Sequence, residues 1–120
     1  MKVKESAPGK IILSGEYAVL DGASSIILPT KQKATVSIEE GNKIENTFIT
    51  SAINGRFSFK VNNDYSVIWT KEKPGKFGLF VESIFKQLRI NKTNNIIITI
   101  QTNDFYFDDI KLGIGSSSAI

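Results

Sequence analysis

Two glycines and three serines stand close together in the run Gly113-Ile114-Gly115-Ser116-Ser117-Ser118-Ala119. Glycine lets backbone N–H groups approach an anion closely, and the N-terminus of a helix adds aligned donors with partial positive charge. Serine hydroxyls cap helices, donate to phosphate or coordinate Mg²⁺. Lys111, which precedes the first glycine by two positions, adds a cation. The chemistry that this combination suits is phosphate binding.

A turn that merely caps a helix has the same composition, so this motif alone does not assign a function. It is neither a Walker A loop nor a dinucleotide fingerprint, because the glycine spacing of both is missing. A second segment also carries chemically useful residues. It reads Ala7-Pro8-Gly9-Lys10, three apolar residues and Ser14, then Gly15-Glu16-Tyr17-Ala18-Val19 and Gly22.

Together the two segments resemble the paired signatures of the galactokinase, homoserine kinase, mevalonate kinase and phosphomevalonate kinase (GHMP) superfamily. The family's amino-terminal signature resembles Pro-Gly-Lys, a few apolar residues, Gly-Glu-Tyr or Gly-Glu-His, then Ala-Val-x-x-Gly, and this chain contains every element in order. The family's phosphate loop resembles Gly-Leu-Gly-Ser-Ser-Ala-Ala. Here Ile114 replaces the leucine and Ser118 the first alanine.

The resemblance implies a role for each matching residue. Lys10 would be catalytic and would also bind substrate, because its ammonium group can stabilise charge on the transferring phosphoryl group or on the acceptor. The acceptor pocket would be lined by Gly15, Glu16 and Tyr17. The ATP phosphates would be held by Lys111, Gly113, Ile114, Gly115, Ser116, Ser117, Ser118 and Ala119, with Ser117 as a Mg²⁺ ligand. Without the resemblance, Lys10 would be read as a solvated lysine and Tyr17 as a half-buried phenol.

The cofactors implied by the resemblance are ATP and Mg²⁺, and the implied acceptor is phosphomevalonate or mevalonate, in isoprenoid precursor synthesis. Tyr17 in place of histidine, together with Lys111-Leu112, is similar to the phosphomevalonate branch. Family members continue to an acidic residue and to a second domain with a further glycine-rich motif. We therefore expect residues 1–120 to be the amino-terminal ATP-binding domain, truncated at the start of the phosphate-loop helix and inactive alone. The expected partners are a small-molecule acceptor, the missing carboxy-terminal domain and a possible second copy in a homodimer.

Composition narrows the alternatives. The 120 residues include neither cysteine nor histidine, which excludes disulfides, thiolate nucleophiles and histidine-based triads. The net charge of +3 comes from scattered lysines, so nucleic-acid binding is not expected. An RNA-binding or non-catalytic module with the same fold stays the alternative. With no signal-like or membrane-spanning segment, we predict a cytoplasmic protein and no membrane partner.

The elements that must position these residues follow from turn signals and periodicity. Pro8-Gly9 predicts a turn between two short extended pieces, and residues 16–20 and 25–28 read as strands joined by a loop. Short alternating runs predict antiparallel strands at 35–38, 57–61 and 65–69, with turns at 54–55 and 62–64. Residues 44–51 fit either a strand or a loop.

The second half of the chain adds a helix. Apolar residues three or four apart predict a helix over 77–88 whose apolar face is Phe77, Phe80, Ile84 and Leu88. The β-branched run 95–100 predicts a buried strand, and a polar and aromatic loop follows. The predicted fold class is α+β, an antiparallel or mixed sheet with helices. It resembles the ribosomal-protein-like amino-terminal domain of GHMP kinases, in incomplete form.

Overall fold

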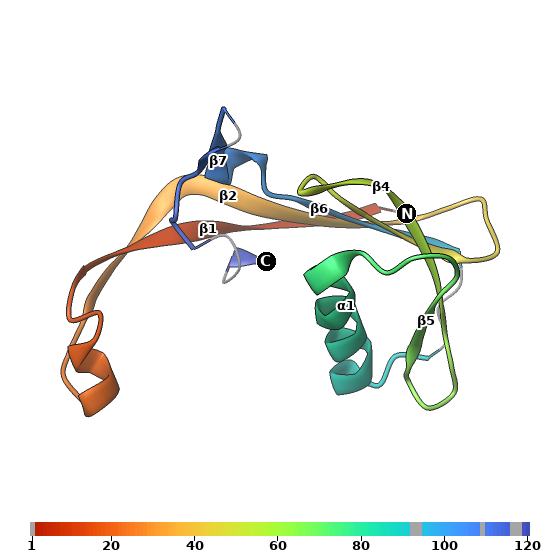
Figure 1. Cartoon of the computed structure of the whole chain (residues 1–120), viewed down its shortest axis with the longest axis horizontal. Helices are drawn as coiled ribbons and strands as arrows, with labels where there is room; N and C mark the ends of the chain where they lie inside the picture. The colour runs from red at the N-terminus through yellow and green to blue at the C-terminus, as the bar shows by residue number, and fades with distance from the viewer. Residues whose placement is uncertain (1, 92–94, 109, 116–118) are drawn as a thin grey trace. The chain divides into compact units, whose positions relative to one another are not determined.

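The computed structural model describes residues 2–91, 95–108, 110–115 and 119–120. Within these residues, six strands form one sheet in the hydrogen-bonded order β1-β2-β6-β3-β4-β5 (Figure 1). Their bounds are Lys2–Ser14 (β1), Ile26–Glu40 (β2), Asn46–Thr50 (β3), Ile53–Val61 (β4), Val67–Trp69 (β5) and Ile96–Gln101 (β6). The other elements are the helix α1 (Gly75–Leu88), the 3-10 helices η1 (Ala18–Asp21) and η2 (Asn103–Phe105), and a ribbon of β7 (Tyr106–Phe107) and β8 (Ile110–Lys111). The predicted α+β class is confirmed.

The chain divides into two compact units. Unit 1 comprises Met1–Lys4 and Ser37–Thr99, and unit 2 comprises Glu5–Val36 and Ile100–Ile120. No helix in the described part of the chain is long and apolar enough to cross a membrane.

Unit 1 is organised around two antiparallel hairpins. The predicted hairpin over 56–69 is confirmed, because β4 pairs with β5 and Phe59 lies opposite Trp69. The undecided segment 44–51 contains β3, which pairs antiparallel with β4. The turn predicted at 54–55 is wrong: Thr50 pairs with Ile53, so the chain reverses at 51–52, three positions earlier, and Gly55 uses its positive φ of 112° inside β4.

The helix α1 lies along this hairpin and confirms the helix predicted over 77–88 (Figure 1). Its predicted apolar face is only partly right. Gly78, Val81 and Phe85 are the buried helix residues, whereas Ile84 and Leu88 are 37% and 66% exposed. The apolar side chains of α1 cover a wider arc of the helix surface than a single stripe. Only the half nearest Val81 and Phe85 packs on the aromatic side chains of β3 and β4.

Four aromatic rings form the centre of unit 1. Phe48 and Phe59 are fully buried, and the Trp69 ring centroid lies 6.3 Å from that of Phe48 and 5.2 Å from that of Phe59. Phe59 also meets Phe85 of α1 edge-on at 5.5 Å. Ring pairs at these spacings add to the stabilisation that comes from burying their apolar area. The helix is therefore fixed to the sheet chiefly by rings.

In unit 2, two predicted breaks lie inside long strands. The turn predicted at Pro8-Gly9 is wrong, because β1 runs without interruption from Lys2 to Ser14. Since β1 is an edge strand of the sheet, proline needs no ladder partner there. The strands predicted at 25–28 and 35–38 are one strand, β2, which continues through Pro29. The six residues of β6 can pair with only part of β2, so proline is tolerated in the remainder.

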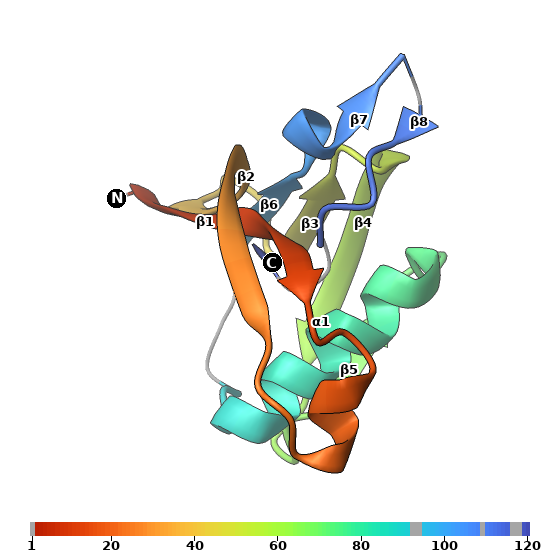
Figure 2. The same ribbon diagram turned by 90° about the vertical axis from the view of Figure 1, so that its left-hand side faces the viewer.

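The strand predicted at 16–20 is also wrong. Gly15 takes a φ of +83°, and the chain then turns into η1 as it passes from β1 to β2 (Figure 2). Hydrogen bonds from Val19 N–H to Gly15 O and from Gly22 N–H to Val19 O close this turn. The left-handed conformation of Gly15 ends the extended chain. The apolar residues around Val19 do not indicate this change of direction.

Candidate phosphate-loop site

A backbone hydrogen bond joins the two sequence motifs within unit 2. The N–H of Lys10 donates to the carbonyl oxygen of Ile114, with a nitrogen-to-oxygen distance of 2.6 Å. In a strand, the N–H groups of alternate residues point to the same side, so those of residues 8 and 10 face the free edge of β1. Pro8 has no N–H group, so it leaves no unpaired donor at this edge. The N–H of Lys10 donates to the loop. The two segments that the resemblance pairs are therefore in direct contact.

Gly9 makes this contact possible. A Cβ at this position would collide with Ile114 O and with the Phe105 ring, and it would lie 2.9 Å from Thr30 Oγ1. Atoms this close are far inside van der Waals separation, so any larger residue would displace the loop from β1. The φ of Gly9 does not lie in the left-handed region. Glycine is therefore needed here for close approach and not for its backbone conformation.

A small apolar cluster holds the loop at both ends. Ala34, Phe105 and Ala119 are buried, and Ala7, Ile114 and Ile120 pack against them. The N–H of Ala119 donates to the carbonyl oxygen of Gly115 at 3.2 Å. Ile114 and Ala119 thus both pack in a cluster that includes Ala7 of β1 and Ala34 of β2.

The glycines of the loop adopt the conformation that a phosphate-binding turn requires. Gly113 and Gly115 have φ values of +71° and +82°, a region that L side chains avoid. No atom of the described residues lies within 4 Å of a Cβ built on Gly113. The described part of the loop therefore has a backbone conformation that glycine adopts without strain. Ser116, Ser117 and Ser118, which carry the predicted phosphate and Mg²⁺ contacts, lie outside the described residues.

Lys111 sits in β8, where it pairs with Tyr106 of β7, and its side chain is exposed. The β7–β8 ribbon was not predicted, since residues 102–112 read only as a polar and aromatic loop. The bond from Leu112 N–H to Phe105 O, at 2.8 Å, returns the chain to the apolar cluster just before Gly113. The ribbon therefore brings a cation to the entry of the loop.

The predicted acceptor residues lie at the far end of β1. Gly15 follows Ser14, the last residue of that strand, so about 15 Å of extended chain separates it from Lys10. A Cβ on Gly15 would collide with Ser24 O, and the φ of Gly15 is positive. Both the lack of space and the backbone conformation therefore require glycine here. Glu16 is exposed and Tyr17 is 79% exposed. The structure thus joins Lys10 to the loop and leaves Glu16 and Tyr17 apart from it on the surface.

The sequence alone did not indicate the residues that support the site. Phe105 is fully buried at the centre of the cluster, and its neighbour Asp104 accepts a hydrogen bond from the backbone of Lys33 at 3.3 Å. Both belong to η2, inside the segment read as a loop. The available signal was the run Phe105-Tyr106-Phe107, which does not show which of its rings is buried. The described residues hold no group of three or more acidic side chains that could bind a metal ion.

No family profile and no curated protein matches this sequence. Solved structures do match. The chain superposes on phosphomevalonate kinase from Streptococcus pneumoniae, solved with phosphomevalonate and AMPPNP, with a TM-score of 0.68 and 18% identity over 98% of this chain. Mevalonate kinase from Methanococcus jannaschii gives a TM-score of 0.72 and 22% identity over 99% of the chain. The Lin0012 protein from Listeria innocua gives 0.73 and 21% over 99%.

This chain spans about a third of each of those proteins, between 33% and 37% of their length. Identities this low establish the fold, and the fold extends over nearly the whole of the present chain. The chain therefore has the fold of the amino-terminal part of mevalonate and phosphomevalonate kinases, as the resemblance of its two motifs predicted.

Proposed function

We propose that this chain is the phosphate-loop part of a GHMP-type kinase that transfers the γ-phosphoryl group of ATP to a small acceptor, phosphomevalonate or mevalonate. The observation that carries the proposal is the bond between Lys10 N–H and Ile114 O. It fixes the lysine of one motif beside the glycine loop of the other. A kinase needs this arrangement, because phosphoryl transfer depends on positioning and on stabilising charge.

In this proposal, backbone N–H groups of the Gly113–Ala119 loop bind the ATP phosphates. The ammonium groups of Lys10 and Lys111 reduce the repulsion between an anionic acceptor and the transferring group. Glu16 and Tyr17 orient the acceptor, and Ser117 holds Mg²⁺, which would neutralise phosphate charge when bound. The base that activates the acceptor is assigned to sequence corresponding to the other two thirds of the superposed kinases.

The acceptor assignment rests on two supports. The S. pneumoniae structure that this chain resembles contains phosphomevalonate. Tyr17 and Lys111-Leu112 are the residues that point to the same branch in the sequence. Mevalonate stays the second acceptor to be tested, since the M. jannaschii protein is a mevalonate kinase.

The test is ATP consumption by the full-length protein with Mg²⁺, supplied with phosphomevalonate and mevalonate separately. Lys10→Ala should reduce turnover by about 10²- to 10³-fold, the usual cost of removing one group that stabilises the transition state. Lys4→Ala is the matched control, because Lys4 is an exposed lysine on the same strand. Turnover with neither acceptor, or equal loss in both variants, would reject the proposal.

A further inference from the structure

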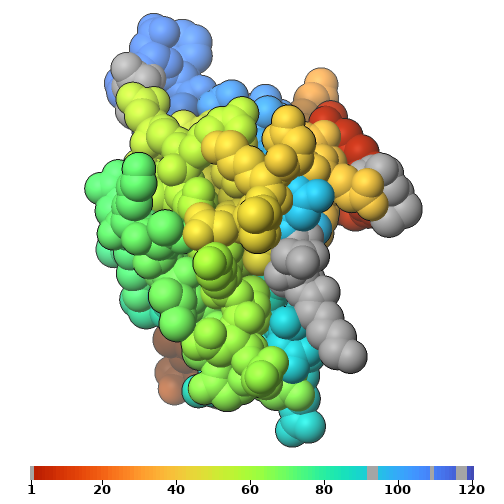
Figure 3. Space-filling model, turned by 90° about the vertical axis from the view of Figure 1, so that its right-hand side faces the viewer, coloured from red at the N-terminus to blue at the C-terminus, as the bar shows by residue number. Residues whose placement is uncertain are grey.

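A small hollow in unit 1 is lined by two cationic side chains. It has a volume of about 10 Å³, the space of about one water molecule, and is bordered by Gly41, Asn42, Lys43, Glu45, Thr47, Arg56 and Ile97. None of these residues belongs to the proposed kinase site. In Figure 3, the loop before β3, in yellow, lies beside the start of β6, in light blue.

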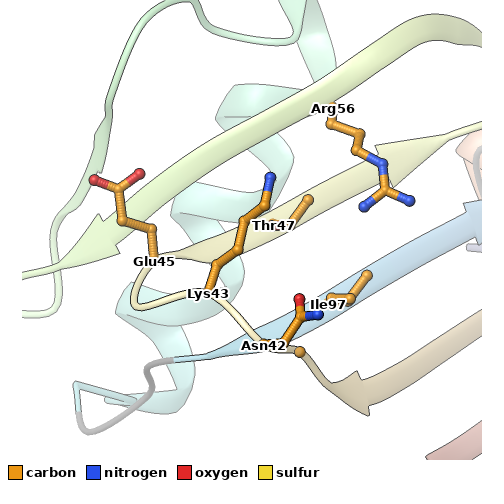
Figure 4. Close-up of a pocket in the computed structure, with 7 residues that line it drawn as sticks. Asn42, Lys43, Glu45, Thr47, Arg56 and Ile97 are labelled. Atoms are coloured by element: carbon orange, nitrogen blue, oxygen red, sulfur yellow. The ribbon is translucent and has the colours of Figure 1, made fainter.

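In the part of the chain that the structure describes, the two cations have no carboxylate partner. Glu45 lies at the rim, but its Oε1 is 3.6 Å from Lys60 Nζ and its Oε2 accepts a hydrogen bond from Thr70 at 3.0 Å. Figure 4 shows the Glu45 carboxylate directed away from Lys43 and Arg56. Among the described residues, neither Lys43 nor Arg56 forms an ion pair. The hollow therefore presents two positive charges that the protein does not neutralise.

The floor of the hollow is rigid and polar. Thr47 is 3% exposed and lies on the side of β3 opposite the buried ring of Phe48, because side chains alternate along a strand. The N–H of Gly41 donates to the carbonyl of Asn95 at 2.7 Å, which fastens the loop to the chain just before β6. The loop that carries Asn42 and Lys43 is thus held in place before any ligand binds, and this lowers the entropic cost of binding.

The available groups are mostly hydrogen-bond donors: a guanidinium, an ammonium, an amide N–H₂ and a hydroxyl. Arginine matches two oxygens of an anion at once, and two cations balance a dianion. We propose that the exposed cations at the mouth of this hollow bind the phosphate group of a small phosphorylated molecule, at a site separate from the Gly113–Ala119 loop. Arg56 and Lys43 supply the charge, while Asn42 and Thr47 fix the orientation.

The test is a titration of the purified protein with inorganic phosphate at constant ionic strength, followed by ¹H–¹⁵N NMR. We expect saturable shifts at the backbone amides of Lys43 and Thr47 and at the Arg56 side chain. The double variant Lys43→Gln/Arg56→Gln should bind at least tenfold more weakly at these positions. Lys71→Gln/Arg89→Gln is the matched control, since it removes the same charge from exposed residues of unit 1.

Several results would overturn this proposal. Three results would show that phosphate responds only to general surface charge: shifts that follow ionic strength, shifts that acetate reproduces equally, or shifts that both double variants lose alike. Shifts confined to residues 113–115 would also reject it and would leave the proposed kinase site intact. Conversely, saturable shifts at Lys43, Thr47 and Arg56 without shifts at residues 113–115 would support this site and would count against the kinase proposal.

Discussion

The backbone N–H of Lys10 donates to the carbonyl oxygen of Ile114 across 104 positions of sequence, at 2.6 Å. The bond uses the free edge of β1, where Pro8 and Gly9 both have a function. Proline leaves no unpaired donor there, and glycine admits Ile114 O and the Phe105 ring. Residues that look like a turn signal in the sequence are instead the docking surface for the glycine loop.

The first prediction concerns the close approach at Gly9. Gly9→Ala should cost about 1–3 kcal/mol in the free energy of unfolding, because the added methyl overfills a packed contact. Urea unfolding measures this change. Lys4→Ala, at an exposed position of the same strand, should stay within about 0.5 kcal/mol. An unfolding free energy for Gly9→Ala equal to that of Lys4→Ala would show that the loop does not press on β1.

The second prediction concerns the pH dependence caused by Glu82. Burial raises the pKa of this carboxyl group, but hydrogen bonds from Lys73 and Trp69 and the charge of Lys73 outweigh it, so the pKa is lowered from 4.5. Both contacts to Glu82 Oε1 are 2.9 Å long. A lowered folded-state pKa gives stability that is fully present above the unfolded pKa and is lost as pH falls through the folded one.

Glu82→Gln should therefore lower stability at pH 7 by about 0.5–1 kcal/mol, in the range of partly exposed ion pairs, and should have a smaller effect at pH 2. Urea midpoints at the two pH values test this. Glu72→Gln, at an exposed position before α1, controls for general charge and should change neither midpoint much. The same loss for Glu82→Gln at both pH values would contradict the assignment.

The third prediction concerns the aromatic centre of unit 1. Phe59→Ala should cost about 3–5 kcal/mol, because it empties a fully buried site beside Trp69 and Phe85. Ile68→Ala, at a position 53% exposed on β5, should cost much less. The single tryptophan, Trp69, reports unfolding of this unit by its fluorescence. A small loss for Phe59→Ala would mean that the rings do not anchor α1.

The fourth prediction is a stabilising substitution at the end of α1. Arg89 adopts a left-handed φ of 52°, and Ile90 N–H bonds to Phe85 O at 3.1 Å. Glycine takes this conformation without steric cost, so Arg89→Gly should add roughly 0.5 kcal/mol after its extra unfolded-state entropy is deducted. Arg89→Ala keeps the Cβ and should bring no gain. Thermal unfolding compares the two variants, and a gain for alanine alone would refute this cause.

Elements with a local signal could be predicted from the sequence. The helix over 77–88, the hairpin over 56–69 and the strand at 95–100 follow from periodicity and turn residues, and α1, β4–β5 and β6 confirm them. Pro8 and Pro29 misled the prediction, because whether proline breaks a strand depends on which edge of that strand is paired. Which edge of a strand is paired is a property of the tertiary structure. The exposed half of the α1 apolar arc is a similar case, since periodicity does not say which part meets the sheet.

For the site, the sequence could identify the two motifs but not their support. Phe105, Asp104 and Thr30 act through contacts with distant residues, and the run of three aromatic residues at 105–107 carries no signal of such contacts. The roles of Glu16, Tyr17 and Lys111 stay predictions, as do those of the three serines of the loop. The fold agreement covers their surroundings without testing the chemistry of the side chains.

The most direct test of the central claim is calorimetric binding of Mg-ATP to the wild-type protein, Gly113→Ala and Gly22→Ala. Both glycines belong to unit 2, both have positive φ, and both would direct a Cβ into open space, so the two substitutions strain the backbone alike. The account predicts binding by the wild type, at least tenfold weaker binding by Gly113→Ala and no change for Gly22→Ala. Absence of wild-type binding, or equal weakening by the two substitutions, would contradict it.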